Sequence, residues 1–148
     1  MNTKIMPTTY LLVAIILCVA FHFVFPIRFL IPSKWNLIGL IPLLVGIWIN
    51  LAADKSLNFA ETTVKPSEES NALVQDGVFR FSRNPMYLGF VSILVGTSLL
   101  LKSLSPYFVV IIFAGVIDQV FIKAEEQMLK ETFGEVWSKY QSRVRKRI

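Results

Sequence analysis

MYLGFVSILVGTSLLLKSLSPYFVVIIFAGVIDQVFI, residues 86–122, is the stretch that decides the fold, because a short polar turn joins two apolar runs there. An α-helix rises about 1.5 Å per residue, and about 20 apolar residues cross a hydrocarbon core. Both runs approach this length. We therefore predict a short transmembrane hairpin with spans over about 86–101 and 106–122.

Two further apolar runs, over about 8–26 and 35–53, precede this hairpin. The first run ends at Pro26 and Arg28 rather than at small residues typical of a signal-peptide cleavage site, so we expect a retained helix. The chain is therefore predicted to be an all-α membrane protein with four transmembrane helices. A cytoplasmic amphipathic C-terminal helical segment is expected to complete it.

Composition supports this class. Hydrophobic residues make up 54% of the 148 residues, the mean hydropathy is +0.58, and the net charge is +5. The Lys and Arg residues flank apolar runs, so membrane topology explains them and nucleic-acid binding is not expected. The single cysteine, Cys18, allows neither a disulfide framework nor a metal cluster. We expect one membrane domain over residues 1–148 and no metal.

The polar segments of the chain are the loop over 54–85 and the tail over 123–148. In the tail, apolar residues recur at steps of three and four, which indicates an amphipathic helix. Gly134 can end one helix and let a second begin, so two short helices and one long helix are both open. The tail's apolar positions are Leu129, Phe133, Val136, Trp137, Tyr140 and Val144.

Charge counting sets the expected topology. With four spans, twelve Lys and Arg residues lie on the side of the termini and the middle loop, and three lie opposite. The positive-inside rule therefore predicts that both termini and this loop are cytoplasmic, and that the membrane is the inner one if the cell is prokaryotic. The twelve are Lys4, Lys55, Lys65, Arg80, Arg83, Lys123, Lys130, Lys139, Arg143, Arg145, Lys146 and Arg147; the three are Arg28, Lys34 and Lys102.

Two elements on that side carry the candidate chemistry. The first is the helix start at Arg83, Asn84 and Pro85, where backbone N–H groups and a guanidinium can bind a carboxylate or phosphate. Asn84 or Ser82 can cap this helix, and a capped helix start without further function is the alternative. The second element is the carboxylate pair that opens the tail, which is either a solvated first turn or a cation site. Asp118, inside the fourth run, fits a functional and a structural role equally.

Taken together, these pieces resemble the isoprenylcysteine carboxyl methyltransferase and phospholipid methyltransferase families over roughly residues 59–144. Two departures stand out: Asn84 replaces the usual His, and Trp137 replaces a usual Tyr. Asn cannot titrate near neutral pH, so this position lacks an acid-base role. The landmarks are Thr62, Thr63, Val64, Pro66, Leu73 to Gly77, Arg83 to Gly89, Glu125, Glu126, Leu129, Phe133, Gly134, Tyr140 and Val144.

The resemblance implies S-adenosylmethionine as methyl donor and a lipid-soluble methyl acceptor that arrives from the bilayer. Carboxylate O-methylation and amine N-methylation both fit. The alternative is a non-catalytic membrane module whose basic tail binds anionic lipid, and a membrane reductase is weaker still. The expected catalytic residues are Arg83, Glu126 and Arg143. The expected cofactor-binding residues are Gln75, Gly77, Arg83, Asn84, Pro85, Tyr87, Leu88, Gly89, Glu125, Glu126 and Tyr140.

Overall fold

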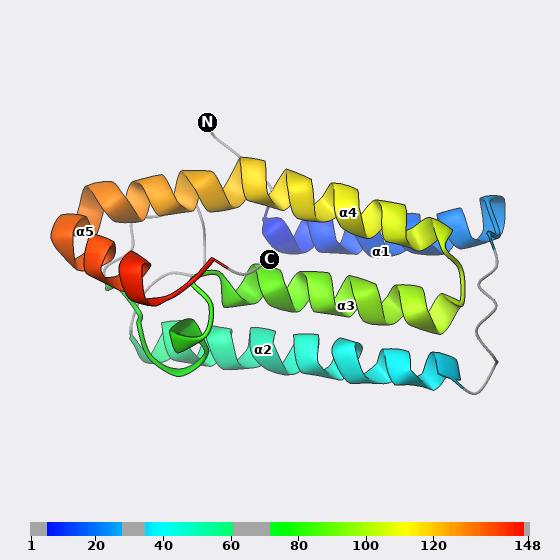
Figure 1. Ribbon diagram of the computed structural model, residues 1–148, viewed down its shortest axis with the longest axis horizontal. Helices are drawn as coiled ribbons and strands as arrows, with labels where there is room; N and C mark the ends of the chain where they lie inside the picture. The colour runs from blue at the N-terminus through cyan, green and yellow to red at the C-terminus, as the bar shows by residue number, and fades with distance from the viewer. Residues whose placement is uncertain (1–5, 28–34, 61–71, 147–148) are drawn as a thin grey trace.

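The structure is a computed structural model that describes residues 6–27, 35–60 and 72–146 (Figure 1). These residues form helices and no strand. The long helices run back and forth, so the start of α1, the end of α2, the start of α3 and the end of α4 share one end of the bundle (Figure 1). The elements are α1 (Pro7–Val24), η1 (Trp35–Gly39), α2 (Leu40–Phe59), η2 (Gly77–Arg80), α3 (Pro85–Leu101), α4 (Ser105–Ile117), η3 (Asp118–Ile122) and α5 (Lys123–Arg143).

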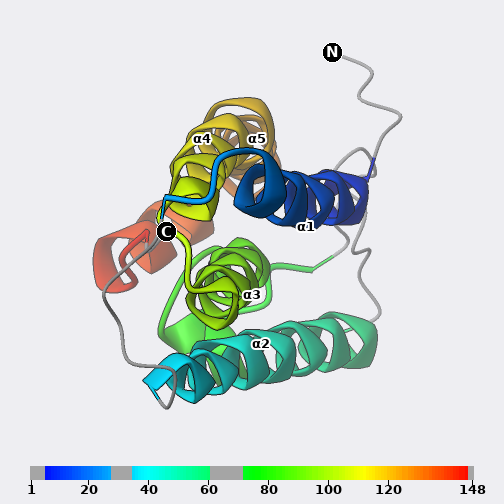
Figure 2. The same ribbon diagram turned by 90° about the vertical axis from the view of Figure 1, so that its right-hand side faces the viewer.

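The helices pack in two main pairs, α2 with α3 and α1 with α4, which the end view separates clearly (Figure 2). The α2–α3 pair is close because glycines face backbone: a Cβ on Gly46 would lie 2.5 Å from the carbonyl oxygen of Gly89. The predicted hairpin is present as a turn at Lys102, whose φ is 57°. Its two helices nevertheless pack more extensively on α2 and α1 than on each other.

The core lies among α1, α3 and α4, where Cys18, Leu94 and Ile117 are fully buried. Large apolar side chains also cover the outside of the bundle, such as Trp48 and Ile111, which are 63% and 70% exposed. A soluble monomer rarely exposes apolar surface on this scale, whereas lipid tails cover it without penalty.

Within residues 6–27, 35–60 and 72–146, three helical stretches are long and apolar enough to cross a membrane: Pro7–Val24, Trp35–Phe59 and Ser105–Arg143. The apolar helix Pro85–Leu101 is shorter. The described chain is therefore all-α with several helices of membrane-spanning character. The count of four spans, and the side of the membrane on which the termini lie, stay predictions.

The middle loop begins later than the sequence predicts. We expected it from Asp54, but α2 continues to Phe59. The apolar run ends near Ala53, yet the helix continues, and an i,i+4 pair supports its exposed end: Asn58 donates to the Asp54 carboxylate at 3.0 Å. Thr62, Thr63, Val64, Pro66, Lys4, Lys65, Arg28, Lys34 and Arg147 lie outside the described residues.

The tail does not start as a separate helix at residue 123. Instead α4 continues through the π-helical turn η3 into α5 without a break. Gly134, with φ 47° and ψ −112°, then ends the first half of α5, so the tail is kinked there as one of the two alternatives expected, although its first half continues α4. After this kink the chain reverses direction (Figure 1), and Trp137 and Tyr140 become buried while Val136 stays 53% exposed. Val136 was expected on the apolar face, and the kink turns it outward.

Candidate functional site

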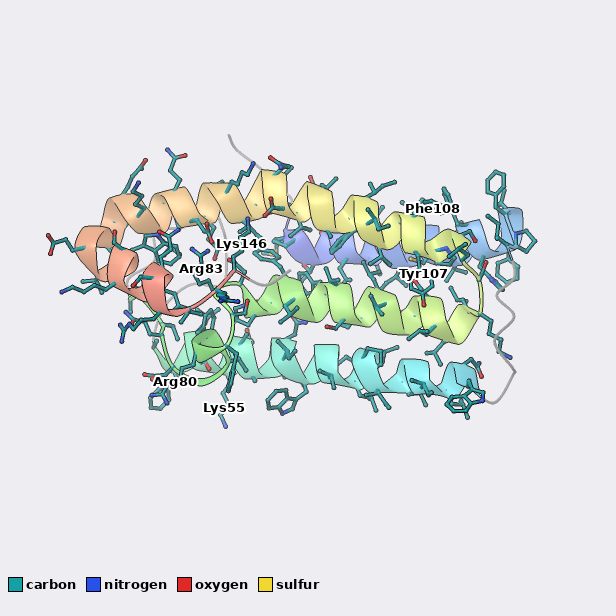
Figure 3. All side chains as sticks on the ribbon, viewed as in Figure 1. Lys55, Arg80, Arg83, Tyr107, Phe108 and Lys146 are labelled. Carbon is teal, nitrogen blue, oxygen red and sulfur yellow. The ribbon has the colours of Figure 1, made fainter. Side chains whose placement is uncertain are left out.

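The candidate site lies at the end of the bundle where three segments meet: the start of α3, the beginning of α5 and the reversed second half of α5 (Figure 1). The continuous helix through η3 carries Glu125 and Glu126 past the apolar part of α4. The kink at Gly134 then brings the remaining tail back toward the start of α3. In Figure 3, Arg83 and Lys146 lie at this end, whereas Tyr107 and Phe108 lie toward the other.

α3 starts at the predicted position, but the predicted side-chain cap by Asn84 is absent. Pro85 occupies the first turn, and Asn84 is the preceding residue. The Asn84 side chain makes no capping bond. Its Nδ2 instead donates to Oε1 of Glu126 at 3.4 Å, while its own backbone N–H donates to Oγ of Ser82 at 3.2 Å. Through its side chain, Asn84 therefore links the start of α3 to α5. Its backbone N–H is satisfied by the Ser82 hydroxyl.

Arg83 pairs with Glu126. Its Nη1 lies 3.2 Å from Oε1 of the carboxylate, and the side chains are only 10% and 18% exposed. The guanidinium carbon also lies 5.9 Å from the centre of the Trp137 ring, a cation–π arrangement. Nε of Arg83 is buried and makes no hydrogen bond within the described residues, whereas Nη1 is engaged in the ion pair with Glu126. Buried donors without acceptors are costly, so this guanidinium retains capacity for an anionic ligand.

Glu125 pairs with Tyr87. The phenol O–H of Tyr87 donates to Oε2 of Glu125 at 3.1 Å. Burial raises the pKa of Glu125 to about 7; the hydrogen bond from Tyr87 opposes this rise, and the neighbouring Glu126 charge adds to it. The two adjacent carboxylates therefore differ in their partners, since Glu126 faces a cation and Glu125 faces a neutral phenol.

Tyr140 fixes the second half of α5 to the loop. Its hydroxyl donates to the carbonyl oxygen of Phe79, in η2, at 2.7 Å. Burial raises the pKa of Tyr140 to about 12, although the positive charge of Arg83 acts in the opposite direction. Tyr140 was expected to bind the cofactor. In the structure it joins two chain segments beside Arg83, and its contact with a cofactor stays a prediction.

Gln75, Gly77 and Arg143 gather away from Glu126. Nη2 of Arg143 donates to Oε1 of Gln75 at 3.4 Å in an exposed pair. Gly77 has φ +61°, a conformation that favours glycine, and opens η2. Gln75 also lines an open cavity of ≈ 590 Å³ between the end of α2 and residues 73–76. The described contacts do not join Arg143 to the Arg83–Glu126 pair, so its catalytic role stays a prediction.

Leu88 and Gly89 lie one turn into α3. The backbone N–H of Leu88 donates to the carbonyl oxygen of Asn84 at 3.2 Å. Gly89 is buried against Gly46 and Asn50 of α2. This packing gives Gly89 a structural reason to lack a side chain, and its expected role in cofactor binding stays a prediction.

Sequence reasoning missed two relationships. Trp137 was treated as an apolar position of the tail and as a lost hydroxyl, but its ring also lies against Arg83. Lys146 was counted only as topological charge, but it forms an ion pair with Asp118. A charged residue inside an apolar run was the available signal for the second relationship, since such a residue needs a partner.

Comparison with known proteins places this geometry in a family. The family model described as "Phospholipid methyltransferase" matches residues 35–136, which include the start of α3 and both glutamates. The chain belongs to the phospholipid methyltransferase family. It is also 30% identical over 141 residues to the protein-S-isoprenylcysteine O-methyltransferase of Saccharomyces cerevisiae. The alignment covers 88% of this chain and 58% of that relative, and no solved structure matches.

Membership in the phospholipid methyltransferase family confirms the resemblance seen in the sequence. The segment that matches the family model also includes the polar residues at this end of the bundle: Arg83, Asn84, Tyr87, Glu125 and Glu126. These five residues come from two elements about forty positions apart and meet through the contacts described above.

Proposed function

We propose that this protein is an S-adenosylmethionine-dependent methyltransferase that acts on a lipidic or isoprenoid acceptor at the cytoplasmic face of a membrane. The observation that carries the proposal is the junction in which Arg83 and Asn84 contact Glu126 while Tyr87 contacts Glu125. It unites the two family-matched elements, and it lies beside helices that are apolar enough to lie in lipid.

The chemistry of these side chains fits the cofactor. S-adenosylmethionine carries a sulfonium, an ammonium and a carboxylate, so its site needs acidic and basic groups close together. Glu126 and Glu125 can hold the cationic groups. Arg83, whose buried Nε lacks a hydrogen-bond acceptor within the described chain, can hold the carboxylate together with the N-terminus of α3.

The bound cofactor would supply a methyl group activated by the sulfonium. Transfer to an acceptor is a displacement that needs no covalent enzyme intermediate, so the side chains act by position and by excluding water. The folded-back half of α5 serves that purpose, because buried Trp137 and Tyr140 cover Arg83 and Phe79.

A carboxyl group is the first acceptor we propose. The name of the yeast relative describes an O-methyltransferase of isoprenylcysteine, and Arg83 and Arg143 are cations of a kind that can hold a carboxylate. Arg143 would bind it while Arg83 holds the cofactor; Arg83 would bind it only if the cofactor's carboxylate is held by the N-terminus of α3 alone. The apolar part of the acceptor would remain in lipid. Carboxylate oxygens are nucleophilic without loss of a proton, so no general base is required.

An amine is the second acceptor, and Glu125 favours it. An ammonium must lose a proton before it can accept a methyl group. A carboxyl group whose pKa is raised to about 7 can take that proton near neutral pH. The matching family, described as phospholipid methyltransferase, is compatible with this acceptor as well.

Labelled-methyl transfer separates these acceptors. The purified protein in phospholipid nanodiscs is incubated with methyl-labelled S-adenosylmethionine and a total lipid extract, and the labelled lipids are isolated. Alkali releases the label as methanol if the product is a methyl ester, whereas an N-methyl product keeps it. No transfer to any lipid would contradict the proposed activity.

Calorimetric titration with S-adenosylmethionine tests the site. We expect Glu126→Gln and Arg83→Ala to abolish binding. The matched controls are Glu131→Gln, an acid on the exposed side of α5 that accepts a hydrogen bond from Gln127, and Arg80→Ala, a 72% exposed arginine paired with Asp76. Figure 3 shows Arg80 near the end of α2, apart from Arg83. Equal binding by all four variants would refute the site.

The same titration also excludes or supports a non-catalytic module. Such a module would bind vesicles that contain anionic lipid through its basic tail, would lose them at high salt, and would produce no heat with the cofactor.

A further inference from the structure

The last described residues of the chain, Val144 to Lys146, form a strap that crosses back over the candidate site. Val144 leaves α5 with extended backbone, φ −112° and ψ 127°. The carbonyl oxygen of Arg145 accepts a hydrogen bond from the backbone N–H of Arg83 at 3.4 Å. Lys146 then pairs with Asp118. The strap therefore contacts both the start of α3 and the helix that carries the glutamates.

The Asp118–Lys146 pair is unusual in its placement. Asp118 begins the π-helical turn η3, inside the stretch that is apolar enough to lie in the membrane. Only 27% of its side chain and 28% of that of Lys146 are exposed. A carboxylate at such a position is costly without a partner, and π-helical turns occur frequently at functional sites. The cost of leaving Asp118 unpaired therefore favours the ion pair with Lys146.

The strap has one consequence for the site. Arg83 is held at its guanidinium by Glu126 and Trp137, and at its backbone by Arg145. If Lys146 leaves Asp118, the strap loses its ion pair to η3 and is held near Arg83 by the backbone hydrogen bond at Arg145. The segment before α3 would then be less firmly restrained.

We propose that Asp118 and Lys146 are positioning residues, which hold the strap closed so that Arg83 keeps the orientation needed to bind the methyl donor. This inference rests on the proposed function. It assigns no contact between Lys146 and a ligand. Its effect falls on cofactor affinity, because the ion pair holds the strap, whose Arg145 contacts the backbone of Arg83, and does not touch the reacting atoms.

Limited trypsin digestion reports the strap without any cofactor. Asp118→Asn leaves every Lys and Arg of the strap in place while removing the charge that holds it. For the full-length variant in nanodiscs we expect cleavage after Arg145 to be about tenfold faster than in the unaltered protein, since local opening governs proteolysis. Cleavage after Arg80, which is exposed elsewhere, is the internal control and stays unchanged.

Methyl-transfer kinetics test the link to the site. We expect Asp118→Asn and Lys146→Gln each to raise the KM for S-adenosylmethionine about tenfold while kcat changes less than about twofold, because a small displacement of a binding group weakens its contacts. Lys146→Arg keeps the charge and should behave as the unaltered protein. The exchanged pair, Asp118→Lys with Lys146→Asp, should recover most of the lost affinity.

The outcomes separate the two ideas. Absence of cofactor binding in the unaltered protein would contradict the proposed function. Normal binding with an unchanged KM in Asp118→Asn and Lys146→Gln would contradict the positioning role alone, and faster cleavage without a change in KM would do the same. Equal cleavage in all variants would show that the Asp118–Lys146 pair does not hold the strap closed.

Discussion

Tyr87 in α3 donates its phenol hydrogen to Oε2 of Glu125 in α5 across 3.1 Å, although 38 positions separate them in the chain. The bond lies where the apolar part of α4 gives way to the polar helix. It places a carboxyl group in a half-buried position beside a second carboxylate, Glu126. Burial and that neighbour both disfavour the charged form of Glu125, which makes the site sensitive to pH.

The first prediction concerns stability against pH. Burial raises the pKa of Glu125 from 4.5 to about 7, so between these values the unfolded chain ionises while the folded chain keeps the proton. The free energy of unfolding therefore falls as the pH rises through this window, by at most about 1.4 kcal/mol per pH unit. Below and above the window Glu125 adds no pH dependence, but above it the whole loss of stability remains. Glu125→Gln should remove this dependence.

Thermal melting in detergent at pH 4.5 and pH 8, followed by tryptophan fluorescence, measures the effect. The difference between the two proteins is the informative quantity, because other groups titrate equally in both. We expect Glu125→Gln to gain stability relative to the unaltered protein at the higher pH. Parallel pH profiles would show that Glu125 ionises freely in the fold.

The second prediction concerns Tyr140. Tyr140→Phe removes the hydroxyl that donates to Phe79 and leaves a carbonyl oxygen without this donor, so the free energy of unfolding should fall by about 1 kcal/mol. Tyr10→Phe is the control, because its ring packs edge-on against Phe121 at 5.1 Å and phenylalanine preserves that contact. Denaturant titration of both variants provides the comparison. Equal stability of the two variants would show that the hydrogen bond from the Tyr140 hydroxyl to Phe79 does not stabilise the fold.

The third prediction concerns the close approach of α2 and α3. Gly46→Ala would put a Cβ 2.5 Å from the carbonyl oxygen of Gly89, and backbone cannot move as a flexible side chain can, so we expect a loss of about 1–3 kcal/mol. Gly115→Ala meets nothing within 4 Å and should be neutral or slightly stabilising. A Gly46→Ala protein as stable as Gly115→Ala would mean that the helices can separate. The melting temperatures of the two variants decide this.

The sequence predicts the helical elements well because uninterrupted apolar runs and turn residues are local signals. The spans expected near 8–26 and 86–101 agree with α1 and α3 within two residues. The end of α2 was missed because polar helix after Ala53 has no apolar signal, and the continuity through η3 was missed because a charged residue such as Lys123 resembles a helix boundary.

The candidate site was predictable in composition but not in pairing. Arg83, Glu125 and Glu126 stand out by their types and positions, yet no local pattern determines which carboxylate faces which partner. That choice depends on how far the helix rotates through η3, a property of the whole α4–α5 helix. The strap depends in addition on the kink at Gly134, which sends the later residues back toward Asp118.

The final prediction therefore concerns Gly134. Its φ of 47° lies where residues with a Cβ are strained. A Cβ added at this position would meet no atom within 4 Å, so the effect of Gly134→Ala comes from backbone conformation alone. Alanine favours continued helix, which would carry Trp137 away from Arg83 and Tyr140 away from Phe79. We expect unchanged or higher helix content by circular dichroism together with loss of cofactor binding. Glu135→Ala, an exposed neighbour in the same helix, should retain binding; retention by Gly134→Ala as well would show that the reversed half of α5 is dispensable for the site.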